Sequence, residues 1–303
     1  MLFARRREHI LAKNYIFRGV GTALVTPFLD GEIDYKTLGA LIDTQVEYVD
    51  ALIVAGTTGE APTLTEDERD ALLTFTLARV NGKIPVIMGT GSNDTRRAVH
   101  LAKRAAALGA DGVLAVTPYY NRGTREGIQR HFLSIAEGSK VPVILYNVPA
   151  RTGGNLSSED YAALLPHPNI VGVKEAEENT EKFFSLSEDF GKEAAIYTGS
   201  DAFLLPSLAL GGAGVISVVS NLYPMTVHAV IRAFVCGDIA GARRTYAAIF
   251  PLCRLLFKET SPSPVKEALR QIGFGNGECR LPLTAPTAAL KVLLEREISR
   301  LST

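Results

Sequence analysis

One repeated unit constrains the fold of this chain more than any other feature. From Gly19 onward, a short apolar run is followed by a polar or glycine-rich turn and then by a longer segment with helical spacing. Successive runs start about thirty residues apart, the length of a strand and its crossover helix. Eight runs are present, at residues 20–25, 51–55, 84–88, 112–116, 141–145, 170–173, 194–197 and 214–218. Alternation of this kind predicts a parallel sheet.

Eight such units in about 220 residues are what a closed (β/α)8 TIM barrel requires. After residue 218 the pattern changes, and four segments have helical spacing with no strand between them: 225–236, 239–257, 264–272 and 284–299. We therefore expect a catalytic barrel over residues 14–237 and a C-terminal helical domain over 238–303. Residues 1–13 contain Arg5-Arg6-Arg7 but no apolar core of a signal peptide, so we expect a short N-terminal extension.

The composition excludes several classes of partner. Lysine and arginine together number 32, as do aspartate and glutamate, so nothing favours nucleic acid or an anionic membrane. No apolar run reaches the roughly 18 residues of a membrane span. The three cysteines are an odd number at long spacings, which argues against a disulfide framework and fits a reducing compartment. We expect a cytoplasmic protein whose partners are small molecules or other proteins.

Polar side chains follow the predicted strands at the end where barrels of this kind carry their chemistry. They are Thr57 and Thr58 after the second strand, Tyr119 and Tyr120 after the fourth, Tyr146 and Arg151 after the fifth, Lys174 after the sixth and Gly199 after the seventh. An amine at the end of a buried strand is unusual. Because desolvation disfavours the ammonium form, Lys174 could act as a nucleophile near neutral pH.

Together these groups suit a 2-oxo acid that forms an imine with Lys174. Threonines among glycines offer donors to a carboxylate, tyrosines can transfer protons, and Arg151 can bind a second carboxylate. Each has a structural alternative. Lys174 could extend its ammonium into water, Gly56–Gly59 could be an ordinary turn, the tyrosines could be packing residues and Arg151 a surface ion pair. Their joint placement on successive strand ends favours the chemical interpretation.

Three motifs resemble those of the pyruvate-dependent class I aldolases, the family of dihydrodipicolinate synthase and N-acetylneuraminate lyase. They are Gly56-Thr57-Thr58-Gly59-Glu60, Tyr146-Asn147-Val148-Pro149 and Val173-Lys174-Glu175-Ala176. The resemblance runs from about Gly19 to Ile272 and implies a TIM barrel. It also implies a homotetramer made of two dimers, with no metal or organic cofactor.

By this resemblance, four residues carry the reaction. Lys174 forms a Schiff base with pyruvate, and Tyr146 donates and accepts protons. Thr57 and Tyr120 complete the proton relay, with Tyr120 supplied by the neighbouring subunit of a dimer.

The resemblance also implies four substrate-binding residues. Thr58 holds the pyruvate carboxylate, Ile216 lines the pyruvate pocket and Gly199 lies near the substrate. Arg151 is similar to the arginine by which the synthase branch binds L-aspartate 4-semialdehyde. The implied reaction is therefore the condensation of pyruvate with this semialdehyde in lysine and diaminopimelate biosynthesis. The alternatives are a 2-oxo-3-deoxy sugar-acid or N-acetylneuraminate aldolase and a non-catalytic relative that binds oxo acids.

One departure from the family concerns feedback regulation. Lysine-inhibited members have a histidine and a glutamate at positions that match Arg69 and Arg97, whereas Asn93 and Tyr119 of that site are retained. A guanidinium in place of the carboxylate repels the ammonium of lysine. We therefore expect weak or absent inhibition by L-lysine.

Overall fold

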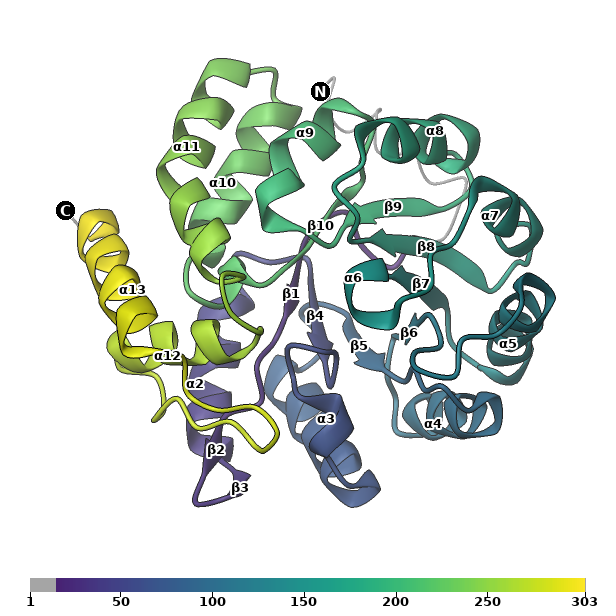
Figure 1. Ribbon diagram of the computed structural model, residues 1–303, viewed down its shortest axis with the longest axis horizontal. Coiled ribbons are helices and arrows are strands. Elements are labelled where there is room, and N and C mark those ends of the chain that lie inside the picture. Colours follow the sequence, from purple (N-terminus) through teal and green to yellow (C-terminus); the bar gives the residue numbers. More distant parts are fainter. Residues whose placement is uncertain (1–14, 303) are drawn as a thin grey trace.

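The computed structural model describes residues 15–302 and contains a closed barrel of eight parallel strands (Figure 1). Around the barrel the order is β1-β10-β9-β8-β7-β6-β5-β4. The strands are β1 (Gly19–Ala23), β4 (Ala51–Val54), β5 (Val86–Gly89), β6 (Gly112–Val116), β7 (Val143–Asn147), β8 (Ile170–Glu175), β9 (Ala195–Thr198) and β10 (Gly214–Ser217). All eight coincide with predicted runs, so the TIM barrel is confirmed. The predicted extension, residues 1–13, lies outside the described residues.

Helices surround the barrel, and most of them begin at a side-chain cap. They are α2 (Tyr35–Gln45), α3 (Glu66–Val80), α4 (Thr95–Ala107), α5 (Arg125–Gly138), α7 (Ser158–Leu164), α8 (Thr180–Phe190), α9 (Leu204–Ala209) and α10 (Pro224–Val235). Both Thr65 before α3 and Ser157 before α7 form complete capping boxes, with Glu68 and Asp160 respectively. These caps satisfy amides that a helix start leaves without partners.

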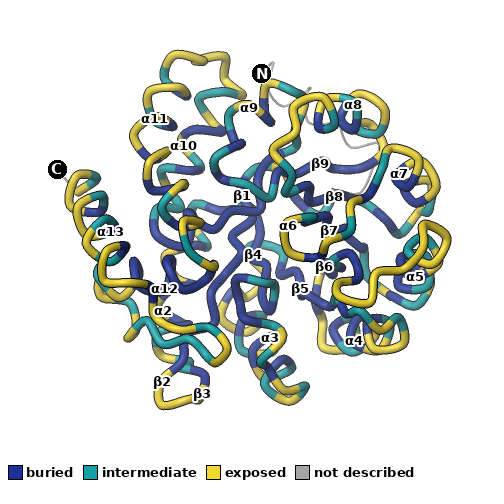
Figure 2. Tube along the Cα trace, in the orientation of Figure 1, coloured by how far each residue is buried: buried dark blue, intermediate teal, exposed yellow. Residues whose placement is uncertain are grey.

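The apolar core has two layers, which follow from the burial of parallel strands on both faces. One cluster lies between the strands and the surrounding helices, and a second fills the barrel interior with side chains such as Ile53, Ile144, Tyr146 and Ile216. Figure 2 shows the eight barrel strands almost entirely buried, while exposed residues lie mainly on the outer helices and loops. A side chain directed into the barrel therefore sits in an apolar environment unless the mouth admits solvent.

After the barrel, helices α11 (Ile239–Leu255), α12 (Ser263–Gln271) and α13 (Ala288–Leu301) follow one another without a strand. Helix α13 lies at the side of the molecule, beyond α12 (Figure 1). The predicted start of this last helix at residue 284 was wrong, because Thr287 caps it by accepting from the Leu290 amide. Within residues 15–302, no helix is both long and apolar enough to cross a membrane.

The prediction also missed a short hairpin between β1 and α2. Strands β2 (Phe28–Leu29) and β3 (Glu32–Ile33) are antiparallel and joined by Asp30-Gly31, both with positive φ. An Asp-Gly pair favours such a two-residue turn, and this local signal could have revealed the hairpin.

Candidate active site

Lys174 and Tyr146 face each other inside the barrel. They are paired residues of the neighbouring strands β8 and β7, and the Lys174 Nζ lies 4.3 Å from the centre of the Tyr146 ring. Both are buried, with 6% and 7% of their surfaces exposed. Strand β8 extends beyond the predicted run, so that Lys174 lies within the strand and not after it. The alternative in which the amine reaches open water is therefore wrong.

Burial changes the protonation of both groups. Desolvation lowers the pKa of Lys174 to about 7, and the negative charge of Asp201 opposes this effect while Arg151 adds to it. Desolvation also raises the pKa of Tyr146, whereas Arg151 and a hydrogen bond with Thr57 lower it. At neutral pH the site thus holds an amine that is neutral in about half of the molecules next to a protonated phenol. This pair can carry out nucleophilic attack and proton transfer.

Gly199 and Ile216 follow the lysine strand β8 at the next two strands of the barrel, Gly199 at the end of β9 and Ile216 on β10. A Cβ at Gly199 would lie 2.9 Å from the Lys174 Cε and 3.0 Å from the Ala176 Cβ, so a glycine is needed at the end of β9. Ile216 of β10 is fully buried and belongs to the interior cluster together with Tyr146. Gly199 therefore lies against the Lys174 side chain, and Ile216 forms part of the apolar interior that also contains Tyr146.

The loop that carries Thr57 and Thr58 joins β4 to the short helix η1 (Ala61–Thr63). Its backbone closes on itself, because the amides of Gly59 and Glu60 donate to the carbonyls of Gly56 and Thr57 at 3.1 Å. Thr58 is 5% exposed, and Thr57 hydrogen bonds with the phenol of Tyr146. This loop therefore brings a hydroxyl to the proton-transfer group.

A buried ion pair holds the same loop from the C-terminal side. The Lys266 Nζ of α12 contacts the Glu60 Oε1 at 2.5 Å, and the Arg280 amide donates to the Glu60 Oε2 at 2.9 Å. Glu60 and Lys266 are both buried, and the backbone of Glu60 has a positive φ of 55°. Nothing in the local sequence signals this pair, because its partners are 206 residues apart.

A cavity of about 270 Å³ opens beside these groups and is lined by Thr57, Tyr146 and Arg151. Arg151 belongs to the four-residue helix α6 (Pro149–Thr152), which lies over the barrel near β7 (Figure 1). Its Nη2 donates to the Ser261 carbonyl at 3.0 Å, and no ion pair of Arg151 occurs among residues 15–302. A guanidinium at the cavity wall without a counterion can bind a carboxylate.

Tyr120 does not line the cavity, and its side chain lies in solvent in the single chain. It is 93% exposed and has a positive φ of 68°, whereas its neighbour Tyr119 lines the cavity. Positive φ is uncommon for an aromatic residue, so the loop presents Tyr120 to solvent at the expense of backbone strain.

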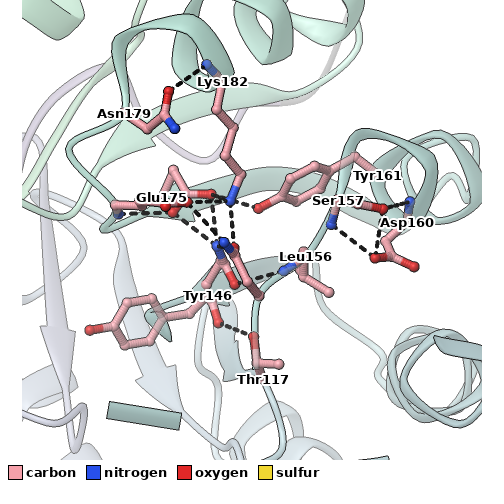
Figure 3. Close-up of polar contacts among 12 residues, drawn as sticks. Thr117, Tyr146, Leu156, Ser157, Asp160, Tyr161, Glu175, Asn179 and Lys182 are labelled. Carbon is pink, nitrogen blue, oxygen red and sulfur yellow. Dashed lines mark hydrogen bonds and ion pairs between the residues drawn. The ribbon is translucent and has the colours of Figure 1, made fainter. Parts of the chain in front are cut away.

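A polar network behind the site was missed by sequence reasoning (Figure 3). Glu175 follows Lys174 and points to the opposite face of β8, as strand geometry requires. Its carboxylate accepts from the Asn147 Nδ2 at 2.9 and 3.0 Å and from the Tyr161 hydroxyl at 2.9 Å. The Lys182 Nζ lies 3.0 Å away, so side chains from α7 and α8 converge on Glu175 while the Tyr146 ring points away from it.

This network determines the register of the two catalytic strands. Asn147 pairs with Glu175 across β7 and β8, one position after the pairing of Tyr146 with Lys174. The Asn147 Oδ1 also accepts from the Leu156 amide at 3.1 Å. The alternation of the motif residues, with one side chain inward and the next outward, could have indicated these roles.

Asp201 is a second residue that the prediction did not assign. It is 1% exposed, and its Oδ2 accepts from the amides of Val218 and Val219 at 2.9 and 2.8 Å. Burial raises the pKa of this carboxyl, and the charge of Lys174 opposes that effect. Asp201 thus supplies a negative potential next to the reactive amine.

The described residues, 15–302, contain no group of three or more His, Cys, Asp or Glu side chains that could hold a metal ion.

Comparison with known proteins identifies the family. The model of the Dihydrodipicolinate synthetase family matches residues 16–300. The chain belongs to this family.

Relatives agree with this assignment. A protein named 4-hydroxy-tetrahydrodipicolinate synthase from Acetivibrio thermocellus is 44% identical over 273 residues, which cover 90% of this chain and 93% of the relative. The solved structure of dihydrodipicolinate synthase from Thermotoga maritima has a TM-score of 0.93 and 42% identity, covering 95% and 99% of the two chains. A chloride-inhibited synthase from Acinetobacter baumannii, solved with pyruvate, has a TM-score of 0.92 and 38% identity, covering 94% and 99%. The predicted resemblance is confirmed.

Proposed function

We propose that this protein catalyses the 4-hydroxy-tetrahydrodipicolinate synthase reaction, the condensation of pyruvate with L-aspartate 4-semialdehyde. The observation that carries the proposal is the buried amine of Lys174, with a pKa lowered to about 7 and the Tyr146 ring 4.3 Å away. A lysine in this state is suited to imine formation and has little value for stability. The relatives named as synthases support the choice of reaction.

In the first half-reaction, neutral Lys174 attacks the carbonyl carbon of pyruvate. A bond forms from Nζ to carbon while the π bond of the carbonyl breaks. The oxygen takes a proton from Tyr146, and Nζ returns one proton to the Tyr146 phenolate, which gives a neutral carbinolamine. Loss of water then produces an imine. Thr57, which hydrogen bonds with Tyr146, relays the protons, and Thr58 binds the pyruvate carboxylate from the buried loop after β4.

In the second half-reaction, the imine acts as an electron sink. Loss of a methyl proton gives an enamine, whose carbon attacks the aldehyde carbon of the semialdehyde while the aldehyde oxygen takes a proton. The amine of the bound substrate then attacks the imine carbon, closes the ring and releases Lys174. Arg151 at the cavity wall binds the carboxylate of the semialdehyde. Proton transfer by a positioned group contributes about 10²–10⁴ in rate.

Tyr120 completes the relay from a neighbouring subunit in this proposal. Its exposure of 93% and its strained backbone are what a residue directed into another molecule would have. We therefore propose a dimer as the catalytic unit and a homotetramer of two dimers as the assembly.

We also propose that the barrel ends at residue 237 and that the helical domain begins at residue 238. A cytoplasmic location is proposed as well, because it suits the three free cysteines.

Reductive trapping tests the proposed function. The protein is treated with pyruvate and borohydride, and the adduct is mapped by mass spectrometry, with consumption of L-aspartate 4-semialdehyde followed in parallel. We expect reduced pyruvate on Lys174 alone, no adduct in Lys174→Met and an unchanged adduct in Lys182→Met. An adduct without consumption of the semialdehyde would assign another aldehyde to the site, such as a sugar-acid fragment. No adduct at all would refute imine chemistry.

Arg151→Ala distinguishes the two aldehyde classes. If Arg151 binds the semialdehyde carboxylate, the variant forms the pyruvate adduct but has a higher KM for the semialdehyde. An unchanged KM would contradict this role.

A further inference from the structure

One lysine outside the barrel strands contacts the loop that carries Thr57 and Thr58. Lys266 lies in α12, in the C-terminal part of the chain, and its Nζ is 2.5 Å from the Oε1 of Glu60, two residues after Thr58. Lys266 does not line the cavity that contains the proposed catalytic groups. An effect of this lysine on the reaction would therefore have to pass through the loop.

The backbone of Glu60 is unusual for a residue with a side chain. Its φ of 55° and ψ of 37° place it in the left-handed region, which glycine adopts with less strain. A glutamate at this position therefore needs compensating contacts. Its carboxylate provides two, because the Lys266 Nζ contacts Oε1 and the Arg280 amide donates to Oε2 at 2.9 Å.

The ion pair is shielded from water. The Glu60 side chain is fully buried, the Lys266 side chain is 3% exposed, and the Lys266 Nζ lies 4.2 Å from the centre of the Phe28 ring. Apolar side chains of similar volume often stabilise a protein as well as a buried ion pair does, because desolvation offsets the attraction between the charges. The geometry that this pair imposes on the loop is therefore a better explanation of its presence than stability.

The turn after β4 connects this geometry to the threonines. The Glu60 amide donates to the Thr57 carbonyl at 3.1 Å, which closes the turn that contains Thr58. On the barrel side, the buried hydroxyl of Thr26 donates to the Gly59 carbonyl at 2.8 Å. The turn is thus held between the end of β1 and helix α12, and a rotation of the Glu60 backbone changes the orientation of both threonines.

We propose that Lys266 is a positioning residue for pyruvate, because through Glu60 it sets the orientation of Thr57 and Thr58. This inference rests on the proposed function, in which Thr58 binds the pyruvate carboxylate. Loss of the ion pair leaves the cavity wall in place but lets the turn adopt other backbone conformations. Pyruvate then binds more weakly, since its carboxylate loses donors that are held in one orientation.

Borohydride trapping at increasing pyruvate concentration measures this role. The double variant Glu60→Gln, Lys266→Met removes both charges, so that no buried charge remains unpaired. Lys291→Met is the matched control, because it makes the same substitution at a lysine 4.0 Å from Glu267, the residue after Lys266. We expect the pyruvate concentration at half-maximal trapping rate to rise about tenfold in the double variant and to stay within about twofold in Lys291→Met.

The pH profile of trapping separates positioning from a general loosening of the site. The pKa of Lys174 depends on burial, Asp201 and Arg151, so the midpoint near pH 7 should not move in the double variant. A loosened site would admit water to Lys174 and move the midpoint towards 10.5.

Amide hydrogen exchange provides a readout that does not depend on pyruvate. In the double variant, the amides of residues 59–61 should exchange faster than in the wild-type protein, because they donate within the turn. Helix α12 should stay as protected as before. If the double variant does not fold, Glu60→Gln alone should raise the half-maximal pyruvate concentration about threefold, and no rise in this milder variant would contradict the proposal.

Three results would overturn the proposal. They are a half-maximal concentration in the double variant within about twofold of the wild-type value, an equal rise in Lys291→Met, and a rise accompanied by a midpoint above about pH 9. If the wild-type protein leaves no adduct with pyruvate, the proposed synthase function fails. In that case faster exchange of residues 59–61 in the double variant supports the positioning of the loop by Lys266, and unchanged exchange refutes it.

Discussion

The rate of imine formation should follow the protonation state of Lys174, and its midpoint can be derived from the structure. At pH 7 a lysine with the ordinary pKa of 10.5 is neutral in about one molecule in 3,000, whereas a pKa of about 7 makes half of the molecules neutral. Burial thus increases the reactive fraction by about three orders of magnitude. Below pH 7 each further unit reduces the neutral fraction about tenfold.

The assay is the initial rate of borohydride trapping at low pyruvate concentration between pH 5 and 10. We expect an acidic limb with a midpoint near 7 in the wild-type protein. Asp201→Asn removes a charge that raises the pKa of Lys174, so its limb should move to lower pH. Arg151→Gln removes a charge that lowers this pKa, so its limb should move to higher pH. Trapping measures imine formation with pyruvate alone. The proposed role of Arg151 in binding the semialdehyde therefore does not affect the measured rate.

Unfolding provides an independent measure of the same shift. Between pH 10.5 and 7 the unfolded chain binds a proton at Lys174 that the folded protein does not, so folding stability falls as the pH decreases. The drop in pKa from 10.5 to about 7 corresponds to about 5 kcal/mol. Lys174→Met lacks the titrating amine and should not show this pH dependence. The difference in unfolding free energy between the wild-type protein and Lys174→Met should therefore change by the same amount over this pH range. A midpoint of the trapping profile above about pH 9, with a constant gap in stability, would refute the reasoning.

Three further predictions concern residues outside the reactive pair. Glu175→Gln should lower the free energy of unfolding, measured in urea, by about 2–3 kcal/mol, because it weakens charged hydrogen bonds around a buried carboxylate. The control Glu177→Gln changes a more exposed carboxylate and should lower this free energy by less than about 1 kcal/mol. Lys266→Met should lower the free energy of unfolding by about 3–5 kcal/mol, because the Glu60 carboxylate stays buried without its cation. If the double variant Lys266→Met, Glu60→Gln is no more stable than Lys266→Met, this cause is wrong. L-lysine should not inhibit the enzyme, since Arg69 and Arg97 repel its ammonium, and an inhibition constant at or below the millimolar range would contradict this.

The local pattern of the sequence determined the barrel and most of the proposed site. Apolar runs and caps depend on neighbouring residues, so all eight strands and the starts of α3 and α7 could be predicted. Because chemistry in such barrels lies at the strand ends, the sequence alone predicts that Thr57, Tyr146 and Lys174 lie close together. The family was indicated separately, by the resemblance of the three motifs to those of its members.

Only the tertiary structure decided how the amine is tuned and supported. The pKa of Lys174 depends on burial and on the charge of Asp201. The two residues are close because β8, which contains Lys174, and β9, which precedes Asp201, are neighbours in the closed barrel. The pairing of Glu60 with Lys266 joins residues 206 positions apart, and the network at Glu175 requires helices α7 and α8 in their final places. These features arise from electrostatic interactions across space, which a period along the chain does not encode.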